Sequence, residues 1–189
     1  MARPMTFDTD ETIDKAVEVF WRRGFGATTP QNLVDELGIG KGSLYNTFKS
    51  KHHLFRLAMH RYSAHRAADL AEALDGPGPV RPKVRAAMQR LAGVGQHDLG
   101  CLIVNSAAEL GSSDAVVAEV SQQMFERIED AFRSAIERGQ ATGELTSGRD
   151  PGDAARALLA VVIGTNVLAK GGRPPAELGS LLDAALVIL

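Results

Sequence analysis

The stretch that decides the fold is TPQNLVDELGIGKGSLYNTFKSKHHLF, which occupies residues 29–55. Thr29 followed by Pro30 favours a helix start, because Thr is a good N-cap and the missing N–H of Pro would be unpaired there anyway. This helix ends at Gly38, which takes the left-handed conformation at little cost. A second short helix is expected over residues 41–48. Two short helices around a tight turn predict a helix-turn-helix, which presents its second helix to the DNA major groove.

The rest of the chain also has the pattern of helices. Clean alternation with period two is missing, and β-branched residues are scattered, so strands are not expected. Further helices are predicted at residues 10–23, 50–74, 81–91, 102–110, 114–140, 153–169 and 176–188. Residues 92–99 and 143–148 are expected to be looser. The sequence therefore predicts an all-α protein.

The predicted helices group into two domains. Residues 1–49 form an N-terminal three-helix helix-turn-helix domain in this interpretation. Residues 50–189 form a C-terminal helical domain, and the helix at 50–74 connects the two. The Gly-Pro-Gly-Pro sequence at residues 76–79 ends that connecting helix.

Composition excludes several classes of protein. The chain has 189 residues, a formal net charge of −2 and one cysteine, Cys101. A single cysteine excludes a disulfide framework or a thiolate zinc cluster and suits a reducing cytosol. No apolar run of about 18 residues is found, and residues 1–10 lack the apolar core of a signal peptide. We therefore expect a cytoplasmic protein that has no metal, no cofactor and no membrane contact.

Charge is distributed unevenly along the chain. No Asp or Glu occurs from Leu37 to Ala68, and that stretch carries four of the five histidines. Its cationic residues are Lys41, Lys49, Lys51, Arg56, Arg61 and Arg66. The part from Asp69 onward is acidic. A local basic block indicates a surface for a polyanion, although a solvated basic helix face is the alternative.

Candidate DNA contacts follow from side-chain chemistry. The residues expected to bind DNA are Thr29, Gln31, Lys41, Gly42, Ser43, Tyr45, Asn46, Lys49 and Lys51. Thr29, Tyr45 and Lys51 suit phosphates, which position a protein without reading sequence. Lys41, Ser43 and Asn46 suit base edges, with Lys directed to guanine and Asn to adenine.

The helix expected at residues 153–169 has no polar face between Leu158 and Gly164. A helix that is apolar all round is buried on both sides. We therefore expect a homodimer built with the last helix as a four-helix interface. Its predicted contacts are Leu158, Leu159, Val162, Ile163, Leu178, Leu182 and Ala185. Packing of both helices inside one chain is the alternative.

Residues 12–55 resemble the DNA-binding domain of the TetR family of bacterial transcriptional regulators. The resemblance is carried by Ala16, Phe20, Gly24-Phe25, Thr28-Thr29, Gly38-Ile39, Lys41-Gly42-Ser43-Leu44-Tyr45, Phe48, Ser50-Lys51 and Leu54-Phe55. It implies a two-domain all-α homodimer that binds a palindromic double-stranded operator, usually as a repressor, and releases it when a small effector binds the C-terminal domain. The chain departs from the family pattern at Gly40, where Ser is usual, and at Val34, where a small Ala is usual.

Aromatic residues are scarce beyond Tyr62, so an effector pocket is expected to be largely apolar. Its candidate residues are Tyr62, His65, Met88, Leu91, Leu102, Asn105, Met124, Phe125, Leu159 and Asn166. Two alternatives remain for regulation. One is a DNA-binding regulator without small-molecule control, and the other is a thiol or electrophile sensor that uses Cys101.

Catalysis is not expected. Residues 38–43 superficially suggest a phosphate loop, but they lack the Gly-Lys-Ser/Thr adjacency and follow no predicted strand. The histidines lack metal-ligand spacing. The sequence therefore predicts that the protein is not an enzyme.

Overall fold

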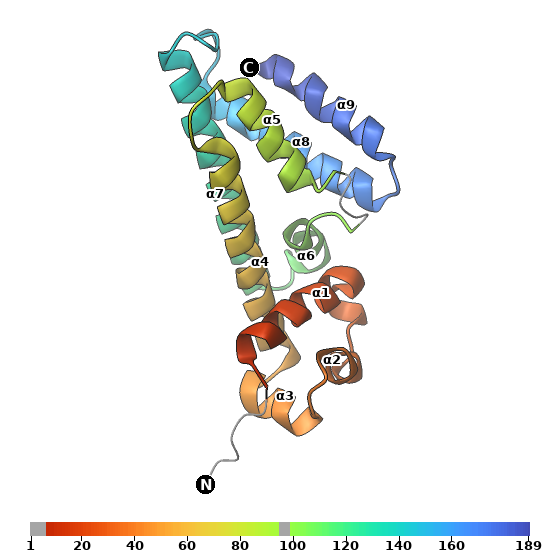
Figure 1. The fold of residues 1–189 in the computed structure, drawn as a ribbon. Helices are drawn as coiled ribbons and strands as arrows, with labels where there is room; N and C mark the ends of the chain where they lie inside the picture. Colours follow the sequence, from red (N-terminus) through yellow and green to blue (C-terminus); the bar gives the residue numbers. More distant parts are fainter. Residues whose placement is uncertain (1–6, 95–98) are drawn as a thin grey trace.

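The computed structural model describes residues 7–94 and 99–189, and within these ranges the chain forms nine α-helices, one short 3-10 helix and no strand (Figure 1). The helices are α1 (Thr9–Ala27), α2 (Pro30–Leu37), α3 (Lys41–Phe48), α4 (Lys51–Leu74), α5 (Val80–Ala92), α6 (Leu102–Leu110), α7 (Ala115–Ala141), α8 (Pro151–Lys170) and α9 (Pro175–Ala185). The all-α prediction is confirmed. Residues 92–99 were expected to be irregular, and residues 95–98 of that region lie outside the described residues.

The molecule is elongated, with two groups of helices joined by one long helix (Figure 1). Helices α1, α2 and α3 lie together at one end. Helix α4 packs on α1 near its start and then runs beside α7 to the other end, where α5, α8 and α9 gather. Helix α6 lies between the groups and contacts α1, α4, α7 and α8.

The predicted helix starts match the local chemistry of the chain. Thr29 and Asn32 form a reciprocal capping box at the start of α2, which ends at Gly38 with a φ of 67°. The Ser50 side chain accepts a hydrogen bond from the backbone N–H of His53 at the start of α4. The prediction for the first helix was too short, because one more turn follows the kink at Gly24, where φ is 76°.

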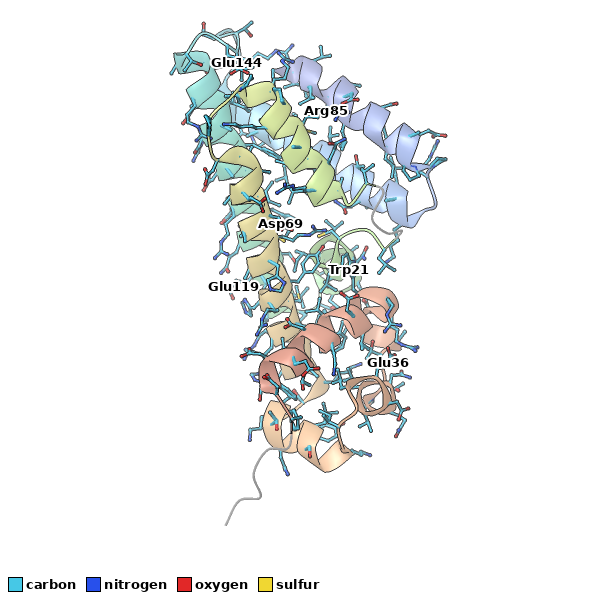
Figure 2. The ribbon with its side chains drawn as sticks, viewed as in Figure 1. Trp21, Glu36, Asp69, Arg85, Glu119 and Glu144 are labelled. Atoms are coloured by element: carbon cyan, nitrogen blue, oxygen red, sulfur yellow. The ribbon has the colours of Figure 1, made fainter. Side chains whose placement is uncertain are left out.

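The start of α5 is capped by a residue far away in sequence. Pro79 at its N-cap provides no side-chain hydrogen bond. The carboxylate of Glu144, in the turn after α7, accepts bonds from the backbone N–H groups of Val80 and Arg81 at 2.8 and 3.1 Å (Figure 2). These bonds stabilise the charged form and lower the pKa of Glu144. The turn after α7 is thereby fixed to α5.

Most of the predicted dimer contacts are buried against helices of the same chain, and their part in a dimer interface stays a prediction. Helix α8 packs on α5, α7 and α9. Leu158 and Leu182 are fully buried, and Ile163 is half-buried. The other buried members of the predicted interface are Leu159, Val162, Leu178 and Ala185. Four helices of the same chain, α5, α6, α7 and α9, cover the buried side of this run, while Ala160 and Gly164 are exposed.

Helix α8 is long and apolar enough, by length and composition alone, to cross a membrane, which the sequence reading had not expected. The core helix of a globular protein has the same properties. In the structure 44% of its most apolar 18-residue window is buried. Packing against α5, α6, α7 and α9 accounts for the buried part of the helix, whereas Val167 and Leu168 remain exposed.

Truncation of Leu158 to Ala tests this assignment of α8 to the core. The side chain is fully buried, so the substitution leaves a cavity and removes apolar contacts. We expect the free energy of unfolding to fall by about 2–5 kcal/mol. Urea denaturation followed by circular dichroism, at one fixed protein concentration, measures the change. A loss below about 1 kcal/mol would place Leu158 outside a packed core.

Candidate functional site

Helices α2 and α3 are held at a fixed angle by a small apolar core. Leu33 and Leu37 of α2 are buried, as are Leu44 and Phe48 of α3. Ile39, in the turn between them, is 8% exposed and fills the space between the helices. The turn is short because Gly38 adopts a left-handed conformation. This geometry leaves the opposite face of α3 open to solvent.

The open face of α3 carries most of the predicted DNA contacts. Lys41, Gly42, Tyr45 and Asn46 are exposed, and Ser43 is half-buried. A Cβ atom added at Gly42 would meet nothing within 4 Å, so another molecule can approach this backbone closely. The face combines a cation, an amide and two hydroxyls on one rigid helix, which is the chemistry that reads base edges and phosphates.

Three further predicted contacts lie at the edges of this face. Thr29 and Gln31 are exposed at the start of α2. The Gln31 side-chain amide donates to the Asp35 carboxylate at 2.7 Å. Lys49 directly follows α3 with a φ of 64°, and its ammonium donates to the Asn46 carbonyl at 3.1 Å. We name the exposed residues of α3 together with these three the α2–α3 face.

Lys51 is engaged within the chain. Its ammonium donates to the carbonyls of Phe25 and Thr28, both at 2.9 Å, and lies 4.0 Å from the centre of the Phe25 ring. These contacts satisfy carbonyl groups at the end of α1. The structure therefore assigns Lys51 to holding α1 against α4, and its contact with a phosphate stays a prediction.

The basic block of the sequence does not form a single cationic surface. Arg61 pairs with Asp10 and Asp14 on α1. Arg66 is buried and donates to the Tyr62 hydroxyl, the Asp69 carboxylate and the Arg90 carbonyl. The expectation of one polyanion surface is thus wrong for these two arginines. Within residues 7–94 and 99–189, Lys41 and Lys49 form no ion pair.

Polar contacts join the helix-turn-helix unit to the rest of the molecule. Trp21 of α1 donates its indole N–H to the Gly100 carbonyl at 3.0 Å (Figure 2). The Glu109 carboxylate of α6 accepts the backbone N–H groups of Phe25 and Gly26 at 3.1 and 2.7 Å. These partners lie 79 to 84 residues apart in sequence. No local sequence signal could have found them.

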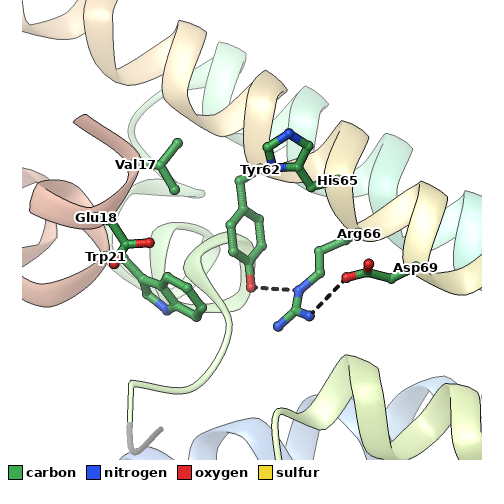
Figure 3. A pocket seen from close by; sticks show the side chains of 7 residues that line it. All are labelled: Val17, Glu18, Trp21, Tyr62, His65, Arg66 and Asp69. Atoms are coloured by element: carbon green, nitrogen blue, oxygen red, sulfur yellow. Dashed lines mark hydrogen bonds and ion pairs between the residues drawn. The ribbon is translucent and has the colours of Figure 1, made fainter. Parts of the chain in front are cut away.

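A crevice of about 290 Å³ opens where α1 meets α4 (Figure 3). Two predicted effector residues, Tyr62 and His65, line it together with Val17, Glu18, Trp21, Arg66 and Asp69. The Tyr62 hydroxyl points toward the Arg66 guanidinium (Figure 3). Burial, and next the neighbouring Cys101 thiol, raise the pKa of Tyr62, so its hydroxyl stays protonated. The crevice belongs to the domain junction and not to the C-terminal core.

A second, much smaller cavity of about 10 Å³ lies inside the C-terminal helices. Its walls are Leu91, Cys101, Val104, Met124, Phe125, Ile128, Leu159, Val162, Ile163 and Asn166. Five predicted effector residues therefore meet here: Leu91, Met124, Phe125, Leu159 and Asn166. The other three do not line it. Met88 and Leu102 are buried in the surrounding core, and the Asn105 amide donates to the Leu99 carbonyl.

Cys101 is a free thiol with 3% of its surface exposed. It occupies the N-cap of α6 without making a side-chain capping bond. Because it borders the small cavity, a reagent would reach it through that cavity. The described residues contain no cluster of three or more His, Cys, Asp or Glu side chains that could hold a metal ion.

Two short helices on a three-helix unit, with an open polar face on the second, define a helix-turn-helix DNA-binding protein. The sequence model described as "Bacterial regulatory proteins, tetR family" matches residues 13–58. The model described as "Tetracyclin repressor-like, C-terminal domain" matches residues 95–185. The chain belongs to the TetR family of bacterial transcriptional regulators, and it is a DNA-binding regulator rather than an enzyme.

Similarity to individual proteins extends over most of the chain. The uncharacterized HTH-type transcriptional regulator YezE of Bacillus subtilis (strain 168) is 34% identical over 155 residues, which cover 79% of this chain and 78% of that protein. The HTH-type transcriptional repressor ComR of Escherichia coli (strain K12) is 27% identical over 188 residues, covering 97% and 88%.

Two solved structures have the same arrangement of helices. A cysteine mutant of the TetR family regulator CifR, complexed with 26-bp double-strand operator DNA, has a TM-score of 0.85 and 29% identity, with 98% of each chain covered. The reduced form of E. coli NemR has a TM-score of 0.82 and 25% identity, with 93% of each chain covered.

The contact between His52 and Asp114 predicts a pH dependence of stability. The Asp114 carboxylate lies 2.5 Å from His52 Nε2 and accepts the N–H groups of Val116 and Val117. The bond from His52 lowers the pKa of Asp114, although burial opposes this shift. A lowered pKa contributes stability above the unfolded value of about 3.9, and that stability is lost as the pH falls through the folded value.

We therefore expect Asp114→Asn to destabilise the protein at about pH 5, where the Asp114 carboxylate is charged, and to have a smaller effect at about pH 2.5. Chemical denaturation at a series of pH values measures the difference. Asp130→Asn is the matched control, because Asp130 is exposed and its polar partner among the described residues is the exposed Arg133, at 2.8 Å. An equal effect of Asp114→Asn at both pH values would show that the charge of Asp114 does not contribute.

Proposed function

We propose that the protein is a cytoplasmic bacterial repressor that binds a palindromic operator as a homodimer and leaves it when a small effector binds. The observation that carries the proposal is the α2–α3 face, an exposed polar helix surface on a rigid core. The likeness to the operator complex of CifR and to the repressor ComR supports it. DNA binding without small-molecule control remains the second candidate, because the internal cavity is small.

The roles of individual residues follow from their places on the α2–α3 face. Lys41, Ser43 and Asn46 are proposed to contact base edges in the major groove. Thr29, Gln31, Tyr45 and Lys49 are proposed to contact phosphates on either side of it. Gly42 allows the backbone to come close to the DNA. Lys51 would act indirectly, because it holds the end of α1 in place.

The proposed dimer uses the outer face of α8 and α9. Val167 is 55% exposed, Leu181 is 44% exposed and Leu168 is 36% exposed, which is unusual for side chains of this size. Leu168 and Leu181 border the same hollow, whose other residues are Arg173, Glu177 and Ser180, so apolar and polar side chains lie together on this face. We propose that this face packs on its copy around a two-fold axis. The buried residues named from the sequence would support it from beneath.

Operator binding can be tested by selection from random duplexes. We expect a motif with two-fold symmetry whose half-sites are about one helical turn apart. Asn46→Ala should cost about 1–3 kcal/mol and relax the preference at one position in each half-site. Tyr45→Phe should weaken binding to all sequences alike, because it removes only a phosphate contact. Enrichment of no symmetric motif would count against the proposal.

The dimer can be tested by sedimentation velocity at micromolar concentration. Leu168→Glu or Leu181→Glu would bury an unpaired charge in the interface. We expect either variant to sediment as a folded chain of 20.1 kDa, while the wild type sediments at twice that mass. Ala68→Glu, on the exposed side of α4, is the control and should leave the dimer intact. A monomeric wild type would exclude the proposed interface.

A further inference from the structure

Residues 99–101, which we name the strap, connect the helix-turn-helix unit to the C-terminal core. The carbonyl of Leu99 accepts a bond from the Asn105 amide of α6 at 2.9 Å. The carbonyl of Gly100 accepts the bond from Trp21 of α1 at 3.0 Å. The side chain of Cys101 borders the internal cavity. One short segment therefore contacts the DNA-binding domain on one side and the cavity on the other.

The strap is pressed against α8 at one residue. Gly100 has a φ of +66°, and a Cβ atom there would lie 2.8 Å from the backbone carbonyl oxygen of Asn166. Both facts restrict this position to glycine. No side chain separates the strap from α8, so a shift of α8 at Asn166 is passed directly to Gly100.

Asn166 is the polar residue of the cavity wall whose hydrogen bonds are incomplete. It is 2% exposed, and its Nδ2 donates to the carbonyls of Leu91 and Val162 at 3.2 and 2.9 Å. Because both partners are acceptors, the amide cannot be turned around. Its Oδ1 is then left buried without a hydrogen-bond partner. An unpaired buried acceptor is costly, so it marks a place for a donor from another molecule.

The size and the lining of the cavity also limit the size and the charge of a ligand that could bind there. Its volume of about 10 Å³ suits one group of the size of a hydroxyl. No charged residue lines it, and the walls apart from Asn166 and Cys101 are apolar, so a charged ligand would be poorly solvated there. Phe125 and Ile163 are the half-buried members of the wall, which gives an aliphatic tail a way out between α7 and α8.

We propose that this cavity binds a small, uncharged, largely aliphatic molecule through one hydrogen-bond donor, and that the strap reports its binding to α1 through Trp21. The ligand O–H or N–H donates to Asn166 Oδ1, and its tail parts Phe125 from Ile163. The resulting movement of α8 at Asn166 displaces Gly100 and the indole that is bound to it. This proposal rests on the effector control proposed above and names the ligand class and the route.

The binding step is tested without DNA, by NMR titration of the ¹⁵N-labelled full-length protein. The probes are the isomers 1-butanol, which has a donor, and methyl propyl ether, which has only an acceptor. We expect 1-butanol to shift the Asn166 side-chain amide signals and to bind about tenfold more tightly than the ether. The indole signal of Trp21, the one tryptophan of the chain, should shift with the same dissociation constant.

A matched pair of variants locates the site. Val162→Ile adds one methylene to a cavity wall and should weaken 1-butanol binding about tenfold or more, while the protein stays folded. Val161→Ile changes the neighbouring residue, which does not line the cavity, and should bind as the wild type does. Equal affinity for alcohol and ether, or no effect of Val162→Ile, would overturn the proposed site.

The route to the DNA-binding domain is tested with Trp21→Phe, which removes the indole donor and keeps an aromatic ring. In the wild type, saturating 1-butanol should weaken operator binding about fivefold or more. In Trp21→Phe the alcohol should bind as before and change operator affinity by less than about twofold. Equal weakening in both proteins, or none in the wild type, would overturn the route. Operator binding without alcohol tests the proposed function separately.

Discussion

The burial of α4 along its whole length is the constraint on which the rest of the structure depends. Near its start, Phe55 packs on Phe20 of α1 with ring centres 4.9 Å apart. Further along, Met59 and Tyr62 are buried where α1 and α6 meet, and Leu70 and Leu74 are buried in the C-terminal core. The buried residues of both helix groups form one continuous hydrophobic cluster, and α4 contributes to it at both ends. The DNA-binding unit cannot turn relative to the body without moving α4 or breaking this packing.

The polar contacts at the junction restrict the remaining freedom. The side chains of Trp21 and Glu109 form hydrogen bonds with backbone groups. These bonds therefore depend on the position of a backbone segment and not on the rotamer of a second side chain. The bond between His52 and Asp114 joins the start of α4 to the start of α7. Each contact is a hydrogen bond of modest net strength, on the order of 1 kcal/mol. Contacts of this size can be exchanged when a ligand binds, whereas the apolar packing of α4 persists.

The sequence predicted what local chemistry determines. The capping box at Thr29, the left-handed Gly38 and the cap at Ser50 place α2, α3 and α4 correctly, because each signal acts within four residues. The face of α3 follows from the inward Leu44 and Phe48. Long-range partners left no such signal, so the capping of α5 by Glu144 and the bond from Trp21 to Gly100 could not be predicted.

Two expectations were limited by the same physical cause. A helix with no polar face indicates that its sides are covered, but not by which chain, and α5, α6, α7 and α9 bury one side of α8 while Val167 and Leu168 stay exposed. A run of cationic residues in the sequence likewise does not indicate which acidic residues pair with them. The acidic partners of Arg61 are on α1. The cavity residues were predicted in part, because Asn166 stands out as an amide on an apolar helix, whereas Tyr62 and His65 face the junction.

The pairing of the arginines explains why DNA binding should depend on the proposed dimer. With Arg61 and Arg66 engaged inside the chain, the described part of one helix-turn-helix unit offers Lys41 and Lys49 as exposed cations without an ion pair. Electrostatic affinity grows with the number of phosphates neutralised, at a slope of about 0.9 per phosphate in log affinity against log salt. Two units on one operator double that number. In the proposed dimer, a change in the distance between the units would remove half of the contacts at once, so a movement of α4 would weaken DNA binding strongly.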